Sequence, residues 1–483
     1  MTARESMSAR LLELEREDLL SFINAALACT GQDEFYGDAT GQALSIGFFH
    51  EYVLGNYRRM YAHCLAAGIN DFNRTKIIFN LLTTSAGVSA PDRHEEGQLI
   101  AAALPELPPP RVYRLFEALV HRRVNNRRTR KIVSDYLAGR RDPQLHALKY
   151  RRRVAKIAAH FHLRLDAEQS AVLFDIGRLR RYETPLFETF RRAHYEKRAI
   201  YELPYTVAEG LAARHRIPRE TFVRGIAPRM TTRERLRLQS SAAALGVDAV
   251  AETELSRHSL TRLAIYFLSL PIRERTNRFE QLDAAMTAAA RHILRHATAK
   301  LGRVALVADN SYSATGSGQK RRRPLALALA THYLLSAAAT ELTTHWTSPI
   351  TSLAELRPRG HTDLATPILD ALAQRPDLLI AVSDGYDNDP PGAAAEVVRV
   401  FRARLDPEGA VTMIHLSPSY DAGSYAVKSI HPAMHSLGIR DVEGVPTLLS
   451  FVRFASGSAK LHELQAYLEA CAHDLLTREA RAR

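Results

Sequence analysis

The sequence is poor in cysteine and contains no long apolar run. Its three cysteines, Cys29, Cys64 and Cys471, lie far apart and lack the spacing of metal ligands. We interpret each of them as a small buried hydrophobic residue rather than a catalytic one. No hydrophobic stretch reaches the length of a membrane span, and the first residues are too charged for the core of a signal peptide. We therefore expect a soluble protein of the reducing cytoplasm that makes no membrane contact.

The chain is too long for one small domain, and its composition is that of a globular protein. The chain has 483 residues, of which 46% are hydrophobic, as in a globular protein. This length exceeds what a single hydrophobic core usually organises. The sequence therefore predicts two or three domains.

Acidic residues are scarce in the first part of the chain. Residues 1–300 contain 47 lysines and arginines against 33 acidic residues, whereas residues 301–483 contain 18 against 19. Within the first part, residues 111–160 alone contain 15 basic and 3 acidic side chains. Ordinary surface solvation does not require such an excess of one charge. We expect an acidic partner to bind this segment.

The first 300 residues have helical patterning almost throughout. Apolar residues in 111–120 follow the i, i+3, i+4 spacing of an amphipathic helix. Residues 127–139 predict a second helix, with Asn125 or Asn126 as its N-cap and Gly139 just after its end. A Thr231/Glu234 capping box predicts another helix start. We expect an all-α domain of helical hairpins, similar to HEAT-like helical repeats, although the sequence reveals no repeat period.

After residue 300 short apolar runs alternate with amphipathic segments. The pattern predicts strands within 303–308, 377–385 and 410–416, separated by helices over 324–342, 364–374 and 393–405. Such alternation is typical of a doubly wound α/β domain with a mostly parallel sheet. Ligands of these folds bind beyond the carboxyl ends of the strands. We therefore predict two domains, 1–300 and 301–483, and look for a site at strand ends.

Three oxygen-bearing side chains follow the first strand of this second domain. Asp309, Ser311 and Ser313 form the pattern D-x-S-x-S directly after the apolar run, and Thr362 and Asp384 come before a helix and at a strand end. Oxygen ligands select hard cations such as Mg²⁺, which prefers octahedral coordination. The set resembles the metal-ion-dependent adhesion site of von Willebrand factor A domains. This resemblance implies that the five residues coordinate Mg²⁺, or another divalent cation, directly or through water.

Other readings of the same segment are weaker. Residues 316–320, GSGQK, lack the spacer and the Ser or Thr of a phosphate-binding P-loop. No recognisable pattern places a histidine beside Ser311 or Ser313 as a catalytic base. His361 adjoins Thr362, but a loop histidine at a metal rim is more often a surface residue than a base. We therefore predict no catalytic residues.

The order of the two predicted domains is itself informative. A basic helical array followed by a von Willebrand factor A domain resembles the TROVE-domain Ro ribonucleoprotein family, and the arginine-rich segment 122–158 adds to this resemblance. The resemblance implies a ring of helical repeats. It further implies that the ring binds small structured noncoding RNA on its outer face and single-stranded RNA ends in its central hole.

Basic residues are clustered around two predicted helix starts. Several lie in the first turn of the helix that begins near residue 127, where the helix dipole makes positive charge unfavourable unless an anion binds. The alternative is an ordinary solvated face balanced by acids elsewhere in the fold. Tyr113 and Tyr150 lie near the clusters, and Tyr150 is the better candidate for stacking on a base. The predicted RNA-binding residues are Arg122, Arg123, Arg127, Arg128, Arg130, Lys131, Arg140, Arg141, Lys149, Arg151, Arg152, Arg153 and Lys156.

Two functions follow from these sites. The first is a noncatalytic RNA-binding protein, with the helical domain as the RNA cradle and the metal domain as a closure element or as a docking site, for instance for an RNA-processing protein. The alternative is an adaptor that recruits a protein such as an AAA+ ATPase through Mg²⁺ and a donated carboxylate, while the basic half binds an acidic protein. No second carboxylate cluster suited to two-metal chemistry lies in the arginine-rich segment, so a nuclease ranks last.

Overall fold

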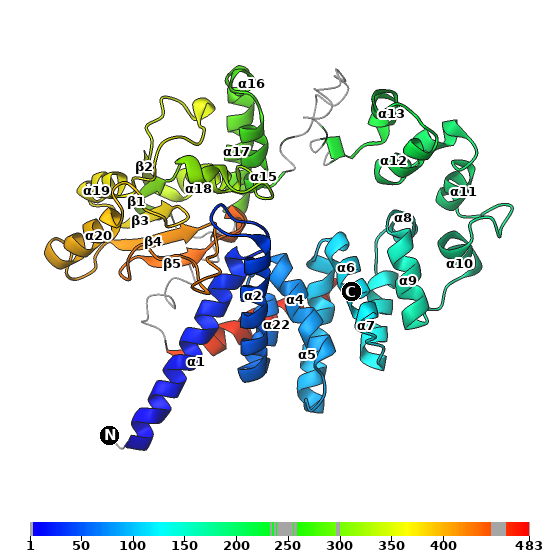
Figure 1. Ribbon diagram of the computed structural model, residues 1–483, viewed down its shortest axis with the longest axis horizontal. Helices are drawn as coiled ribbons and strands as arrows, with labels where there is room; N and C mark the ends of the chain where they lie inside the picture. Colours follow the sequence, from blue (N-terminus) through cyan, green and yellow to red (C-terminus); the bar gives the residue numbers. More distant parts are fainter. Residues whose placement is uncertain are drawn as a thin grey trace. The chain divides into compact units, whose positions relative to one another are not determined.

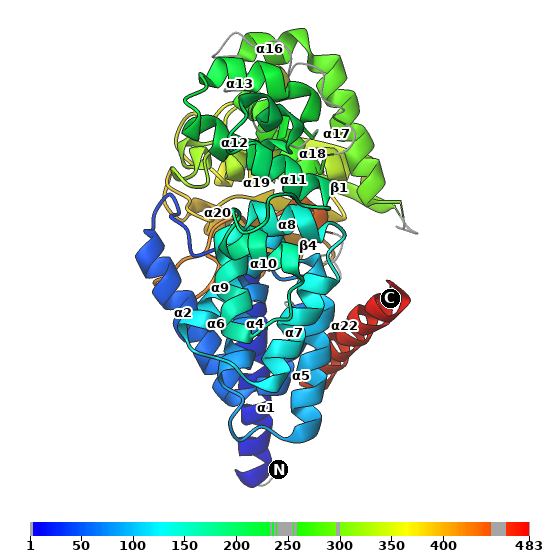
Figure 2. The same ribbon diagram turned by 90° about the vertical axis from the view of Figure 1, so that its right-hand side faces the viewer.

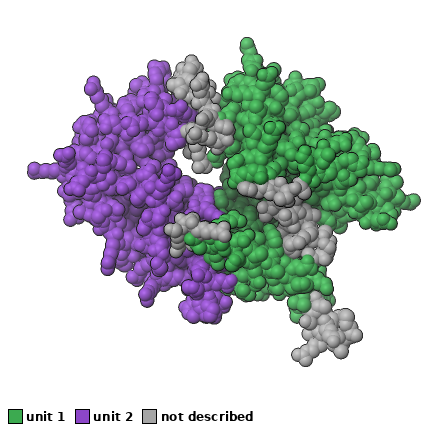
Figure 3. Space-filling view, turned by 180° about the vertical axis from the view of Figure 1, so that it is seen from behind, with its two compact units in different colours: residues 1–77, 255–483 green, residues 78–254 purple. Residues whose placement is uncertain are grey.

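The computed structural model describes residues 3–231, 234–235, 238, 255, 258–295, 300–445 and 460–482. The chain forms two compact units, which Figure 3 shows in different colours. Unit 1 contains residues 1–77 and 255–483, and unit 2 contains residues 78–254. These units divide the chain differently from the two sequence segments 1–300 and 301–483, because the first helices belong to the same unit as the α/β domain.

The α/β domain of unit 1 is built on a five-stranded sheet in which every neighbouring pair of strands is parallel (Figure 1). The spatial order is β2-β1-β3-β4-β5. Val304 of β1 pairs with Leu342 of β2 on one side and Leu378 of β3 on the other, which sets the register at the centre of the sheet. The strands are β1 (Leu301–Ala308), β2 (Ala339–Trp346), β3 (Leu378–Val382), β4 (Thr412–Ser417) and β5 (His435–Gly438).

Helices cover this sheet because its central strands are apolar on both faces. The buried residues Ala305 and Val307 of β1 pack with Ile368 of α19 (Ala365–Ala373) and Val398 of α20 (Ala393–Arg404). Helix α18 (Arg323–Ala338) contacts β1, β2 and β3 and also packs against α15 (Leu260–Ser269) and α17 (Phe279–Ile293). It lies between two layers, which explains why most of its residues are buried.

The strand β2 corrects one prediction. The sequence predicts a helix over 324–342, but α18 ends at Ala338 and residues 339–342 begin a strand. Helix-forming residues such as Ala339 and Leu342 favour the helix locally. Pairing of β2 with β1 along seven residue pairs overrides that local preference.

The first helix of the chain packs against β5, which is an edge strand of the sheet. Helix α1 (Ala3–Ala28) contacts β5, and the Asn24 side chain donates a hydrogen bond to the Ser436 carbonyl at 2.8 Å and accepts one from the Gly438 amide. An edge strand with unpaired backbone groups is prone to aggregation, so this side-chain amide covers a vulnerable edge. Unit 1 also contains α2 (Ala39–Asn56), α3 (Arg58–His63), the start of α4 (Asp71–Thr83), α16 (Ile272–Asn277) and α22 (Leu461–Ala482).

Unit 2 is a succession of short helices (Figure 2). The helix predicted from residue 127 begins there, and the Asn126 side chain accepts a hydrogen bond from the Thr129 amide, as an N-cap does. Thr231 and Glu234 form the predicted reciprocal capping bonds, while most of the segment after them lies outside the described residues. The helices are α5 (Ala90–Ala103), α6 (Pro109–His121), α7 (Arg127–Ala138), α8 (Pro143–Lys149), α9 (Arg151–Phe161), α10 (Ala167–Phe174), α11 (Pro185–Arg192), α12 (Tyr205–Arg214) and α13 (Arg219–Ile226).

The predicted fold class is confirmed. A helical N-terminal region precedes a parallel α/β domain whose strand order is consistent with a von Willebrand factor A-like fold. Among the described helices, none combines the length and the apolar character needed to cross a membrane.

Candidate metal centre and nucleic-acid interface

The candidate metal ligands come from three loops at the carboxyl edge of the sheet. Asp309 follows β1 directly, and its amide donates a hydrogen bond to the Val382 carbonyl at 3.0 Å, which continues the pairing of β1 with β3. The chain then turns through the short 3-10 helix η7 (Tyr312–Thr315), which contains Ser313. Asp384 follows β3, the neighbouring strand, and Thr362 precedes α19. The parallel order of β1 and β3 therefore brings both aspartates to the same edge.

All five predicted ligands are buried and joined by hydrogen bonds. The Ser311 amide donates to Oδ1 of Asp309 at 2.8 Å, and Oγ1 of Thr362 donates to Oγ of Ser311 at 2.9 Å. The hydroxyls of Ser311 and Ser313 lie 3.3 Å apart, and Ser313 also hydrogen-bonds to Asp384. Each of the five side chains is at most 5% exposed. The structure thus brings the complete predicted set together at one point.

The two carboxylates share an electrostatically unfavourable environment. Burial, and after it the nearby Asp309 carboxylate, raise the pKa of Asp384 to about 6, although hydrogen bonds from Tyr386 and Ser313 and the charge of Lys428 act in the opposite direction. Burial also raises the pKa of Asp309. Two negative charges held together out of water favour a bound cation.

Several groups that position Asp309 were not predicted. Oγ of Ser383 donates to Oδ2 of Asp309 at 3.2 Å, and Oγ1 of Thr347 donates to Oδ1 at 3.3 Å. The Asn310 side chain accepts a hydrogen bond from the Ser348 amide at 2.7 Å and so fixes the loop after β1. Ser383 could have been suspected because it immediately precedes Asp384, whereas nothing in the sequence marks Thr347.

An aromatic rim lies beside this centre, contributed partly by the loop between α1 and α2. The rings of Tyr36 and Tyr386 are 4.4 Å apart, and the ring of Phe35 lies 6.5 Å from that of Tyr312. Tyr36 and Tyr312 are 51% and 67% exposed, which is high for aromatic side chains. Tyr36, Asp384 and Tyr386 also line a cavity of about 140 Å³. A partner at the metal edge would therefore meet aromatic surface.

Lys320, the lysine of the segment 316–320 that was considered as a P-loop, forms a buried ion pair. Lys320 is buried and forms an ion pair with Glu34, which is also buried. Because its ammonium group is already paired with Glu34 and buried, Lys320 is not available to bind a phosphate. Among the described residues, no histidine hydrogen-bonds to Ser311 or Ser313, and His361 is exposed on its loop.

Two of the three cysteines are buried thiols, as the sequence predicts. Cys29 and Cys64 are buried, and burial raises the pKa of the two thiols to about 11 and about 12. A thiol reacts as the thiolate, so both are inert near neutral pH.

The donor set fits Mg²⁺. It offers two carboxylates and three hydroxyls, all oxygen, within one hydrogen-bonded cluster. Within the described ranges, no group of three or more histidine, cysteine or acidic side chains gathers into an alternative metal site. A softer metal that selects thiolate or imidazole would find no comparable set there.

No protein-family model matches the chain, and no curated protein is significantly similar to it. The assignment of both sites therefore depends on residues and geometry alone.

The thirteen predicted RNA-binding residues lie on α7, α8 and α9 and in the turns that follow α6 and α7, all within unit 2. Nine are exposed, and the other four are half-buried. The exposed ones are Arg122, Arg123, Arg127, Arg130, Lys131, Arg141, Lys149, Arg152 and Lys156, and the half-buried ones are Arg128, Arg140, Arg151 and Arg153.

The half-buried members hold the unit together. Arg128 forms an ion pair with the buried Glu96, with 3.1 Å between Nη2 and Oε2. Arg151 donates from Nε to the Val172 carbonyl. Arg153 donates to Glu117, and Arg140 lies over the ring of Tyr136, 4.9 Å from its centroid. These four side chains are therefore less available to a ligand than the sequence suggests.

The two tyrosines near the basic clusters stack on each other. The rings of Tyr113 and Tyr150 lie 4.4 Å apart at an angle of 28°. Tyr113 is fully buried, while Tyr150 is half-buried and has the ammonium of Lys149 5.7 Å from its ring centroid. Tyr150 therefore stays the better candidate for stacking.

Proposed function

We propose that the chain is a noncatalytic RNA-binding protein in which the basic helices of unit 2 hold the phosphate backbone of RNA. The observation that carries this proposal is the missing counter-charge. Only four of the thirteen predicted residues, Arg128, Lys131, Arg153 and Lys156, form an ion pair with an acidic side chain among the described residues.

The lack of acidic partners argues against the alternative that these basic residues form an ordinary solvated face balanced by acids elsewhere in the fold. Lys131 pairs with Asp135 on its own helix, and Arg153 and Lys156 share the single acid Glu117. The remaining nine, of which Arg140 and Arg151 are half-buried, form no ion pair with an acidic side chain in the part of the chain that the structure describes. Like charges concentrated on one part of the surface repel one another, so they destabilise the folded unit rather than help it to fold. A polyanion relieves this repulsion and releases its own counterions, and this provides the driving force for binding.

RNA is favoured over an acidic protein because many positive charges are spread along three successive helices, α7 to α9, and the turns before and between them. Phosphate contacts of this kind position a backbone without reading its sequence. A Ro-like protein that binds small structured noncoding RNA and single-stranded RNA ends matches this pattern and the order of the two folds.

The proposal is tested by nucleic acid that accompanies the protein through purification. We expect protein prepared at low salt to show a raised ratio of absorbance at 260 to 280 nm. RNase, but not DNase, should lower this ratio. If the purified protein carries no nucleic acid and binds no added structured RNA at low salt, RNA binding is wrong.

A second function is supported by the metal centre of unit 1. We propose that Asp309, Ser311, Ser313, Thr362 and Asp384 hold Mg²⁺ and that this edge docks a protein partner, such as an RNA-processing factor or an AAA+ ATPase. Bound Mg²⁺ would supply a positive charge that attracts a carboxylate of the partner. The protein's own hydroxyls and carboxylates hold the ion, and the exposed rings of Tyr36 and Tyr312 would contact the apolar part of the partner. Calorimetric titration with Mg²⁺ tests the site, and absence of binding would remove this function.

A further inference from the structure

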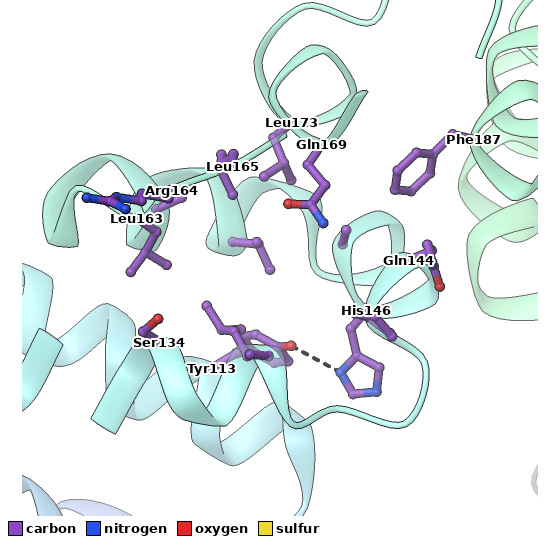
Figure 4. A pocket seen from close by; sticks show the side chains of 16 residues that line it. Tyr113, Ser134, Gln144, His146, Leu163, Arg164, Leu165, Gln169, Leu173 and Phe187 are labelled. Atoms are coloured by element: carbon purple, nitrogen blue, oxygen red, sulfur yellow. Dashed lines mark hydrogen bonds between the residues drawn. The ribbon is translucent and has the colours of Figure 1, made fainter. Parts of the chain in front are cut away.

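Unit 2 contains a cavity that none of the thirteen predicted RNA-binding residues lines. Its volume is about 350 Å³, within the range of roughly 300–1,000 Å³ typical of small-molecule pockets. Side chains from α6 to α11 line it, and Figure 4 shows them from close by. Leu163, Leu165, Leu173 and Phe187 are among the apolar residues that line it, and the buried Tyr113 lines it as well.

Two uncharged polar side chains face this apolar surface without a protein partner for their free groups. Figure 4 shows the carboxamide of Gln169 directed into the space above Tyr113 and His146. Within the described part of the chain, this carboxamide makes no hydrogen bond, since only the backbone amide of Gln169 is engaged, by Asp166. Nδ1 of His146 lies 3.0 Å from the Tyr113 hydroxyl, which fixes the ring and leaves Nε2 without a described partner.

The charges lie at the rim of the cavity rather than inside it. Arg140, Arg141 and Asp142 belong to the turn between α7 and α8, which has a net positive charge, and the residues on both sides of this turn, Ala138 and Pro143, line the cavity. The guanidinium of Arg164 points away from the centre in Figure 4 and is exposed. A ligand that fits must therefore present a neutral polar part to the interior and an anionic part to the rim.

We propose that this cavity receives one nucleobase of a bound single-stranded RNA segment, whose phosphates are held by the arginines at the rim. This inference rests on the RNA binding proposed above and deepens it. A base is flat, uncharged and bordered by donors and acceptors, so it matches both the apolar walls and the Gln169 carboxamide. Proteins commonly recognise RNA by bases turned out of a single strand into such surroundings. A carboxamide offers one donor and one acceptor side by side, the arrangement that reads a base edge.

The test compares short single-stranded homopolymers of adenine, cytosine and uracil by fluorescence anisotropy at one fixed salt concentration. We expect the parent protein to prefer one base by about tenfold, the scale of a good paired contact. In Gln169→Leu, which keeps the size of the side chain but removes both hydrogen-bonding groups, all three homopolymers should bind with the affinity of the weakest. The salt dependence should not change, because phosphate contacts are untouched.

Gln98→Leu is the matched control. Gln98 is exposed on α5 of the same unit and does not line the cavity, so this variant should discriminate between bases as the parent does. The inference is overturned if the parent binds all three homopolymers equally, or if Gln169→Leu keeps the preference, as it would if the cavity received an apolar side chain of a protein. Failure of RNA binding itself is distinguishable, because the parent would then bind none of them.

Ultraviolet crosslinking keeps the inference testable if Gln169→Leu does not fold. RNA bound to the parent protein is crosslinked, and the modified peptides are identified by mass spectrometry. Crosslinks on peptides that contain His146, Gln169 or Phe187 support a base in the cavity. Crosslinks confined to peptides outside the cavity lining contradict it.

Discussion

The metal edge of unit 1 and the basic helices of unit 2 use polar side chains in opposite ways. At the metal edge, five oxygen-bearing side chains are buried and each is held by the others. On the basic helices, most charged side chains are exposed, and Lys131 keeps 77% of its side-chain surface in water. One site therefore depends on individual atoms and the other on a sum of charges. This difference predicts sharp loss in the first and graded loss in the second.

The largest expected effect is loss of Mg²⁺ binding in Asp309→Asn. The substitution keeps the shape of the side chain but removes one of two carboxylates, so calorimetry should detect no Mg²⁺ binding. RNA affinity should stay unchanged, because the charge proposed to bind RNA lies in unit 2. Asp370→Asn is the control, since Asp370 is exposed on α19 and outside the ligand set. Unchanged Mg²⁺ binding in Asp309→Asn would show that the metal assignment is wrong.

A graded effect is expected when four exposed arginines of unit 2 are replaced together. Changing Arg122, Arg123, Arg127 and Arg130 to glutamine should weaken RNA binding about a hundredfold at low salt. The slope of affinity against salt should fall by about 0.7 for each lost contact with single-stranded RNA. All RNA sequences should be affected alike. Filter binding at several salt concentrations measures both quantities.

The control for this variant takes four exposed arginines from unit 1, namely Arg273, Arg291, Arg321 and Arg404. It removes the same net charge from the chain and should leave RNA affinity within a few-fold of the parent. Equal losses in the two variants would mean that total charge, and not unit 2, determines binding.

Arg128 separates the structural from the ligand-binding role of the basic residues. Arg128→Gln removes the ion pair between Arg128 and the buried Glu96, so unit 2 should lose about 2 kcal/mol of stability, below the full cost for a completely buried pair because Arg128 is 21% exposed. Arg127→Gln next to it should change stability by less than about 0.5 kcal/mol. Urea denaturation of both variants measures the difference. Equal stability would show that the Glu96 pair contributes nothing.

Acid is expected to lower the stability of unit 1, by an amount that stays below the Arg128 effect until about pH 5. His50 is buried between the Tyr61 hydroxyl and the Asn73 side chain, and burial lowers its pKa to about 3. The unfolded chain takes up this proton near pH 6.5, while the folded chain does not, so stability falls as the pH drops below 6.5. The loss should reach about 2 kcal/mol at pH 5. Urea midpoints across this pH range should fall less steeply in His50→Gln, and an identical slope would contradict the assignment.

Local sequence signals were enough to predict that the candidate metal ligands lie together, and to predict most helices and strands. Asp309 and Asp384 could be predicted together because each follows an apolar strand and parallel strands end at one edge. Asn126 could be predicted as a cap because its side chain bonds within its own turn. In each case the physical cause lies within a few residues of the signal.

Features that depend on distant contacts could not be predicted in this way. The strand β2 forms because Ala339 and the residues after it pair with β1, against their helical preference. Asn24 bonds to backbone groups of Ser436 and Gly438, which are more than 400 residues away. Gln169 is an ordinary surface-type residue in the sequence, and only the packing of α6 to α11 places it in a cavity. Exposed charge was predicted as a patch, but its division between ion pairs and free cations required the structure.

The central claim is that unit 2 holds RNA through its phosphates, independently of the metal edge. The most direct test is the affinity of the full chain for one RNA, measured by filter binding from about 50 to about 200 mM salt, for the parent and for Asp309→Asn. With about six phosphate contacts, affinity should fall on the order of a hundredfold across this range, with the same slope in both proteins. RNA binding that is absent at low salt, insensitive to salt or lost in Asp309→Asn would contradict the account.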